Sequence, residues 1–306
     1  MKISVVYAHL NQPNNLMYSV LSQLEALEFA GLDYEIIIVD NGSEQVEFVE
    51  RWVDNLKPNH NIELLHEEVK GPVWAFQKGA EVATGDFIAF SDCHVYVKHD
   101  FYAYIMPHFD NPKVGNVYPA TDLDPGLFGD KALHYGFGKG SYYAKASPNP
   151  ARTEPYKIKV AQQESNPIRM ELYKAFGMFN KNAFLDNGGY TADEMMAGIK
   201  TWMWGYEVIL EPRAVAVHGF IAPVVDGGHE KREKADSMTT LCWLLEGKDI
   251  AKNHWEGQKH NSTYSSWEEF CAKNEANIIP ERDFILSNQK YSYNEIWSIW
   301  DKEGVA

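Results

Sequence analysis

The sequence has little of what defines several classes of protein. Its three cysteines, Cys93, Cys242 and Cys271, are odd in number and far apart in a chain of 306 residues. A disulfide framework or a zinc knuckle is therefore not expected. Long apolar runs are also missing, since the longest, such as residues 36–39, have the length of a strand. A membrane-spanning helix needs about 20 apolar residues, and the sequence predicts none.

Positive charge is scarce as well. The chain has 28 Lys and Arg against 43 Asp and Glu, which gives a formal net charge of −15 at pH 7. Proteins that follow the phosphates of nucleic acids usually have a basic surface, so an extended interface of that kind is not expected. A small basic groove stays open. Hydrophobic residues make up 45% of the chain, enough for a large core.

No leader is expected ahead of the first predicted strand. The apolar run at residues 3–7 starts almost directly after Met1. A signal peptide needs a basic and an apolar segment before the folded domain. We therefore expect neither a signal peptide nor a membrane anchor, and a cytoplasmic protein.

The first third of the chain shows a regular alternation of strand and helix patterns. Strands are predicted at residues 2–8, 34–39, 62–66 and 87–90. Helices are predicted between them at 16–29, from a cap at Ser43 through Trp52, and at 73–83. This order indicates an open, doubly wound α/β sheet, in which ligands bind at the carboxyl ends of the strands.

The pattern weakens between residues 110 and 163, where glycine, tyrosine and proline are frequent. We expect long loops over a binding face there. A helix at about 192–204 and two short strands at 206–210 and 214–218 follow, and polar helices are expected after residue 219.

The end of the fourth predicted strand carries the most informative chemistry. Residues 86–94 read Asp-Phe-Ile-Ala-Phe-Ser-Asp-Cys-His, so Asp92 and His94 leave a buried strand with one residue between them. Alternate residues project to the same side, and both side chains can therefore converge on one ion. A carboxylate with an imidazole suits Mn²⁺ or a similar ion that bridges two phosphates. Taken alone, the sequence Asp-x-His also fits an aspartate that caps a turn and a histidine that lies on the surface.

Two other positions suit a bound nucleotide. Asp40 ends the second strand before Asn-Gly-Ser, where a carboxylate can accept a hydrogen bond from a base or a ribose. Gly71 precedes a helix, and without a Cβ it allows close backbone contact. The alternatives are an Asp at a tight turn and an ordinary loop glycine.

In this order, the blocks resemble family-2-like glycosyltransferases with the GT-A fold. The resemblance covers residues 2–220, weakly at 110–165, and includes the first strand, which ends near Ala8. It implies a Rossmann-like mixed sheet flanked by helices, with nucleotide contacts at Ala8, Asp40, Gly71 and Asp92. The family commonly has Asp-Asp-Gly-Ser and Asp-x-Asp, and this chain departs from it at Asn41 and His94.

The Asp-x-His form is similar to that of the polypeptide N-acetylgalactosaminyltransferases. These enzymes use a later histidine as a third metal ligand. Residues 201–206, Thr-Trp-Met-Trp-Gly-Tyr, and the following strand that ends in His218 look like the segment that carries it. The resemblance therefore implies Mn²⁺, or Mg²⁺, held by Asp92, His94 and His218.

A catalytic carboxylate is predicted near the start of the helix at about residue 192. Inverting members of the family place a Glu-Asp pair there, and this chain has Asp193 and Glu194 in the reverse order. Such a carboxylate takes the proton of the acceptor hydroxyl. Two acids in a first helical turn also simply complement the helix dipole. The N-acetylgalactosaminyltransferases retain configuration, so the stereochemistry stays open.

These inferences predict a GT-A catalytic domain at residues 1–220 and a helical C-terminal appendage at 221–306. The polar segment 226–232 is a candidate lid over the active site. Basic candidates for the leaving diphosphate are Arg152, Lys157, Lys159 and Arg169.

The predicted reaction is metal-dependent transfer of a sugar from a nucleotide-sugar, with UDP-sugar as the first candidate, to an acceptor hydroxyl. A glycan, a protein, a lipid carrier or a modified nucleobase all fit as acceptor. One alternative, a nucleotidyltransferase, calls for a glycine-rich basic loop after the first strand, but residues 9–15 contain no Gly, Lys or Arg. Another is a non-catalytic module that binds nucleotides or glycans.

Overall fold

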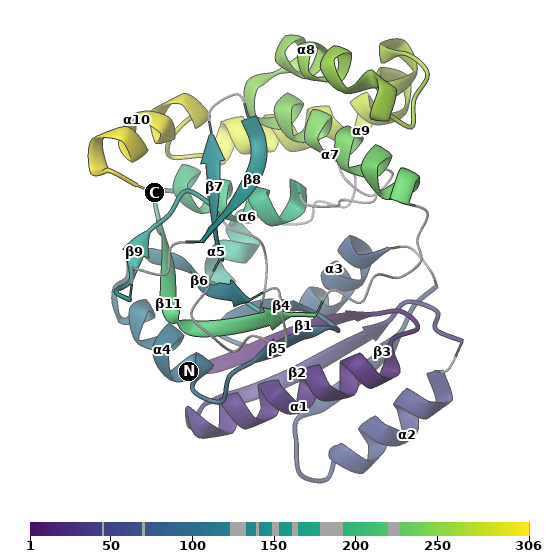
Figure 1. Ribbon diagram of the computed structural model, residues 1–306, viewed down its shortest axis with the longest axis vertical. Coiled ribbons are helices and arrows are strands. Elements are labelled where there is room, and N and C mark those ends of the chain that lie inside the picture. Colours follow the sequence, from purple (N-terminus) through teal and green to yellow (C-terminus); the bar gives the residue numbers. More distant parts are fainter. Residues whose placement is uncertain are drawn as a thin grey trace.

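The computed structural model describes residues 1–44, 46–68, 71–122, 133–138, 141–148, 153–160, 165–177, 192–219 and 227–305. A mixed sheet runs through the centre of the molecule, with helices on both of its faces (Figure 1). This architecture confirms the predicted α/β class with a helical C-terminal region.

The first third of the chain forms the expected βαβαβαβ unit. Its strands pair in parallel in the order β3-β2-β1-β4, so their carboxyl ends lie at one edge of the sheet. The elements are β1 (Lys2–His9), α1 (Pro13–Phe29), β2 (Asp33–Asp40), α2 (Val46–Leu56), β3 (Ile62–His66), α3 (Pro72–Val82) and β4 (Phe87–Asp92). Helix α2 begins at Val46, three residues after Ser43, whose hydroxyl accepts a hydrogen bond from the Asn11 N–H.

The remaining strands extend the sheet beyond β4. They follow in the order β10-β6-β11-β5, and β10 is antiparallel to both of its neighbours. A hairpin leaves the sheet at β6, and a short strand pairs with β11. These strands are β5 (Val95–Val97), β6 (Val114–Asp122), β7 (Leu133–Gly138), β8 (Ser141–Pro148), β9 (Tyr156–Lys157), β10 (Pro167–Arg169) and β11 (Glu207–His218).

The expectation of long loops from residue 110 to 163 is wrong where β6, β7, β8 and β9 form, and β6 is a central strand of the sheet. Its sequence hides it, because Gly115, Asn116 and Pro119 interrupt the β-forming residues. Packing explains the glycine: a Cβ at Gly115 would lie 2.5 Å from Leu172 Cδ2. Long-range packing therefore overrides the local signal.

The two strands predicted at 206–210 and 214–218 are one strand, β11, with a bulge. Glu211 lies opposite Pro119 of β6, whereas Val215 lies opposite the next residue, Ala120. The fully buried Glu211 carboxylate holds the bulge. It accepts hydrogen bonds from the Arg213 backbone N–H and guanidinium, and its Oε2 lies 2.8 Å from His108 Nε2.

Helices form layers on both faces of the sheet. On one face, α1, α2, α4 (Phe101–Ile105) and η1 (Met106–Asp110) cover the core. On the other lie α3, α5 (Met170–Ala175) and α6 (Ala192–Met203) (Figure 1). No helix in the described ranges is long and apolar enough to cross a membrane.

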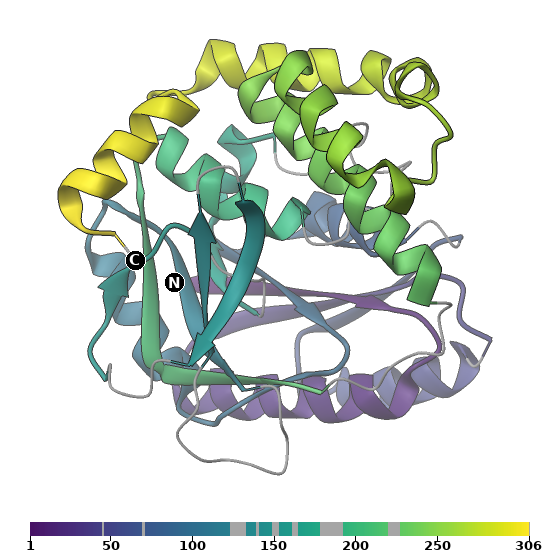
Figure 2. The ribbon, with the colours of Figure 1, turned by 45° about the horizontal axis from the view of Figure 1, so that its top comes forward.

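The C-terminal helices lie beyond α6, as Figure 2 shows. They share a hydrophobic core with α6 and β11, in which Trp202 and Trp300 meet with ring centroids 6.2 Å apart. The division of the chain at residue 220 stays a prediction. These helices are α7 (Gly227–Glu246), α8 (Lys248–Gln258), η3 (Lys259–Asn261), α9 (Trp267–Asn288) and α10 (Tyr293–Glu303).

We predict that Glu211→Gln destabilises the fold by about 1–3 kcal/mol near pH 7, because it removes a buried charged acceptor. Burial opposes ionisation of Glu211, but the hydrogen bonds from Arg213 and His108 outweigh it and lower its pKa from 4.5 to about 2. The carboxylate therefore stabilises the fold above about pH 4.5, and this contribution is lost as the pH falls toward 2.

Urea unfolding of both proteins at several pH values measures this effect. The difference in unfolding free energy between wild type and variant should shrink below about pH 4. Glu63→Gln, at an exposed position on β3, is the matched control and should behave like the wild type. A difference that stays constant down to pH 3 would show that ionisation of Glu211 does not hold the bulge.

Candidate active site

Asp92 and His94 lie far from His218 in the sequence, and the three residues meet at the carboxyl edge of the sheet. Asp92 ends β4 and lies opposite Ala8 of β1. The chain then turns through His94 into β5, which pairs with β11 so that His218 lies opposite Val95. The Gly219 N–H donates to the His94 carbonyl at 2.9 Å. Backbone pairing therefore brings the two histidines together.

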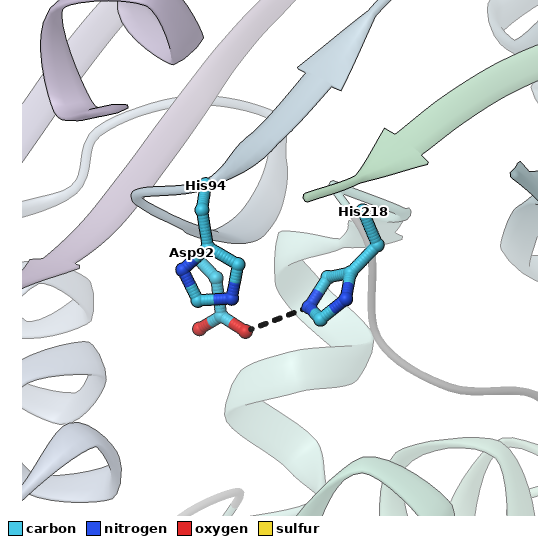
Figure 3. A group of neighbouring side chains, drawn as sticks. All are labelled: Asp92, His94 and His218. Atoms are coloured by element: carbon cyan, nitrogen blue, oxygen red, sulfur yellow. Dashed lines mark ion pairs between the residues drawn. The ribbon is translucent and has the colours of Figure 1, made fainter. Parts of the chain in front are cut away.

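Figure 3 shows the three side chains directed into one space. One ligand-type atom from each lies within 4.8 Å of the others. His218 Nε2 is 3.6 Å from Asp92 Oδ2, and the two imidazole rings have centroids 4.7 Å apart. The His218 side chain is 6% exposed and that of Asp92 35%, so the carboxylate is reachable from solvent. One carboxylate and two imidazoles suit a transition-metal ion.

The ionisation of the cluster also suits a metal. Burial opposes ionisation of Asp92, but the contact with His218 and the charges of His94 and His218 prevail and hold its pKa below the ordinary value. Burial lowers the pKa of His94, against the opposing effect of Asp92. An ionised carboxylate and a neutral imidazole are the forms that bind metal ions.

Asp40 lies at the same edge of the sheet as Asp92, but its carboxylate is already engaged. It is 2% exposed, and Oδ1 lies 2.9 Å from His9 Nδ1. Its Oδ2 accepts hydrogen bonds from the Gly42 and Ser43 N–H groups. Burial opposes ionisation, but these bonds lower the Asp40 pKa to about 2. Its predicted contact with a nucleotide stays a prediction.

His9 is a buried member of this edge that the sequence reasoning missed. Its Nε2 accepts a hydrogen bond from the Gln12 N–H, so Nδ1 has the proton and donates to Asp40. Ser43 Oγ lies 3.2 Å from the same Nδ1. A Ser-His-Asp relay needs both ring nitrogens, so these residues are not one. The sequence did contain a sign of this pair, because His9 directly follows the first predicted strand and Asp40 the second, and the two strands pair at these residues.

Ala8 is half-buried at the edge of the sheet, whereas Gly71 has open space beside it. Ala8 lies between Val39 and Asp92 in the sheet. Gly71 precedes α3 with φ 97°, and a Cβ built there meets nothing within 4 Å. The positive φ favours glycine at this position, and the space that a side chain would occupy there is free.

The predicted catalytic acids lie at the expected place in the backbone. Helix α6 begins at Ala192, so Asp193 and Glu194 are in its first turn, but their side chains lie outside those described. Arg152 and Asp226, the first residue of the candidate lid, also lie outside the described residues.

The other basic candidates are not brought to the cluster. Lys157 lies opposite Ile209, at the far end of β11 from His218, and pairs with Glu207 and Glu303. Arg169 donates to backbone carbonyls at the amino edge of the sheet. Lys159 Nζ lies 5.5 Å from the centroid of the Trp297 ring. These residues support the fold.

Comparison with solved structures shows the same fold in glycosyltransferases. GalNAc-T7 with UDP, GalNAc and Mn²⁺ matches with a TM-score of 0.60 and 18% identity, over 91% of this chain and 58% of that one. TarS 1–349 of S. aureus matches with 0.56 and 13%, over 94% and 89%. The mannosyltransferase PcManGT of Pyrobaculum calidifontis with GDP-Man and Mn²⁺ matches with 0.56 and 16%, over 98% and 87%.

The family is shown by the sequence itself. The chain spans little more than half of GalNAc-T7, and no curated protein matches it. The model of glycosyl transferase family 2, however, matches residues 4–181, which is more than half of the chain. Together with the shared architecture, this match means that the chain belongs to glycosyl transferase family 2 and is a glycosyltransferase with the GT-A fold.

Proposed function

We propose that this glycosyltransferase transfers a sugar from a nucleotide-sugar to an acceptor hydroxyl with the help of a divalent cation. Asp92, His94 and His218 would hold Mn²⁺, or Mg²⁺. The observation that supports this most directly is the convergence of their ligand atoms within 4.8 Å at the carboxyl edge of the sheet. Ligands of open α/β sheets bind at that edge.

The charges of the three side chains fit an anionic donor. Asp92 contributes one negative charge, and a neutral His94 contributes none. When bound, a divalent ion would neutralise the two phosphates and stabilise the leaving diphosphate. The single carboxylate leaves the loaded site with a net positive charge, which a diphosphate complements.

The nucleotide would lie along the same edge, over Ala8, Asp40 and Gly71. The Ala8 side chain is only a methyl group on a strand between two others, and a Cβ added to Gly71 would meet nothing within 4 Å. His9 fixes the Asp40 carboxylate and so holds the turn that follows β2. We propose a UDP-sugar donor because the metal motif resembles that of the N-acetylgalactosaminyltransferases, and GalNAc-T7 binds UDP.

Asp193 and Glu194 are the proposed acids for the acceptor. One of them would remove the proton of the acceptor hydroxyl as the sugar carbon is attacked. We assign residues 1–220 to the catalytic domain, residues 221–306 to the helical appendage, and residues 226–232 to a lid that excludes water. Helix α7 begins at Gly227, within this segment.

We predict that one nucleotide-sugar, first of all a UDP-sugar, binds with Mn²⁺ and loses its affinity with a chelator. Removing one of three ligands weakens metal binding, so His218→Ala should reduce donor affinity by at least about tenfold. Isothermal titration of UDP-, GDP- and other nucleotide-sugars measures both effects. His260→Ala, at an exposed position in η3, is the control.

The outcomes separate the parts of this proposal. Donor binding that persists with chelator and in His218→Ala would contradict the metal site alone. Failure of every nucleotide-sugar to bind would contradict the donor class and favour a module that binds another ligand.

We further predict that Glu194→Gln or Asp193→Asn lowers kcat by about 10²–10⁴-fold with donor affinity unchanged, because a general base acts only on the acceptor. Release of the nucleotide with water as acceptor measures kcat before the acceptor is known, and NMR of the released sugar gives its anomeric form. Glu171→Gln, in the first turn of α5, controls for loss of a helix-dipole charge. Normal turnover in both variants would exclude both residues as the base.

A further inference from the structure

A chain of buried polar side chains lies beneath the turn that contains Asp92 and His94. Helix α1 is otherwise apolar where it faces the core, yet it directs Ser19 and Gln23 there, and both are completely buried. The two residues are four apart and lie on the same face of the helix. A buried polar group costs free energy unless it forms hydrogen bonds, so the partners of these residues matter.

Gln23 begins a directed series of hydrogen bonds that ends at Asp92. The Gln23 Nε2 donates to Ser165 Oγ at 2.8 Å, and its Oε1 accepts from the Tyr102 hydroxyl at 2.6 Å. Ser165 Oγ donates to Ser91 Oγ at 2.8 Å. Ser91 Oγ in turn contacts the Asp92 carbonyl oxygen at 3.2 Å. The series therefore reaches the backbone just before the turn.

Ser19 reaches the backbone just after the turn. Its hydroxyl donates to the carbonyl of Val95, the residue that follows His94, and lies 3.1 Å from the Tyr7 hydroxyl. One turn further along α1 on a neighbouring face, Ser22 Oγ accepts from the Val97 N–H at 3.1 Å. Helix α1 thus binds the segment directly after His94, and through Ser165 and Ser91 it reaches the backbone at Asp92.

Ser165 adopts an unusual backbone conformation to take part. Its φ is 59°, in the left-handed region that non-glycine residues seldom occupy. Its N–H donates to the Phe90 carbonyl at 2.9 Å, and its side chain links Gln23 to Ser91. Such conformations persist only where the surroundings hold them, and they cluster at functional sites.

We propose that Gln23 and Ser19 are positioning residues that set the geometry of the Asp92–His94 turn, so that both proposed ligands meet His218. This inference rests on the proposed metal site. Neither residue is part of the three-residue cluster, and both act through the backbone on either side of it. His218 ends β11, which is held on one side by β6 without any hydrogen bond from Ser19 or Gln23 within the described ranges, and on the other side pairs with β5. The hydrogen bonds from α1 therefore act on two of the three ligands.

The test compares Mn²⁺ binding to the full chain of wild type, Gln23→Met and Ser19→Ala. Methionine keeps the length of glutamine and lacks its amide, while Ser19→Ala is the milder change. Electron paramagnetic resonance with Mn²⁺ alone reports both the affinity and the symmetry of the bound ion. We expect about tenfold weaker binding and an altered spectrum in both variants, as for other residues that orient metal ligands.

The matched control is Ser4→Ala, at the opposite end of β1. Ser4 is also completely buried and has two hydrogen bonds, to Glu35 Oε1 and from the Gly85 N–H. Its loss should lower stability to urea as much as Ser19→Ala does, and leave Mn²⁺ affinity within about twofold. Equal loss of Mn²⁺ affinity in all three variants would reduce the role of α1 to general stability and overturn the inference.

The remaining outcomes distinguish this inference from the proposed function. If the wild type binds Mn²⁺ and Gln23→Met and Ser19→Ala bind it equally well, the positioning role is wrong while the metal site stands. If the wild type itself binds no Mn²⁺, the proposed site fails, and the inference fails with it.

Discussion

The parallel pairing of β1 with β2 and β4 is the constraint on which the candidate site depends. It places His9 opposite Asp40 and Ala8 opposite Asp92, so that groups far apart in the sequence share one edge. In a strand, successive side chains point to opposite faces, and a slip of one residue would turn every one of them over. The apolar runs of these strands, buried on both faces, fix the register and thereby the chemistry.

The bulge in β11 extends this constraint to His218. Leu210 lies opposite Tyr118 and Glu211 opposite Pro119, and three extra residues, 212–214, then precede Val215, where the pairing resumes. Side chains alternate between the two faces of the sheet, so an insertion of three residues, an odd number, reverses the face to which even-numbered residues point. Leu210 accordingly packs in the core of the C-terminal helices, whereas Ala216 packs under α1. Glu211, in the middle of β11, accepts the hydrogen bonds at the start of this bulge, and the bulge sets the face on which His218 lies at the end of the strand.

The parts that the sequence predicts are those encoded by neighbouring residues. The strands β1–β4 and the pair Asp92 and His94 follow from local apolar runs and a spacing of two. His218 was identified only through the resemblance to a family, because Asp92 and His94 are more than 120 residues away in the sequence. Strand β6, the bulge and the buried series from Gln23 to Ser91 escaped because each depends on long-range contacts. For the buried series, the sequence offered one local sign, which was Gln23 among the apolar residues of helix α1.

The histidine in place of an aspartate at position 94 has a physical meaning in so acidic a chain. A protein with a net charge of −15 repels a nucleotide diphosphate, unless a local field reverses the sign at the site. Two carboxylates would cancel the charge of a divalent ion, whereas Asp92 alone leaves one positive charge for the donor. Imidazole also favours Mn²⁺ over the harder Mg²⁺, which prefers oxygen ligands. Charge and ligand type therefore both fit the proposed function, in which a transition-metal ion would hold an anionic donor.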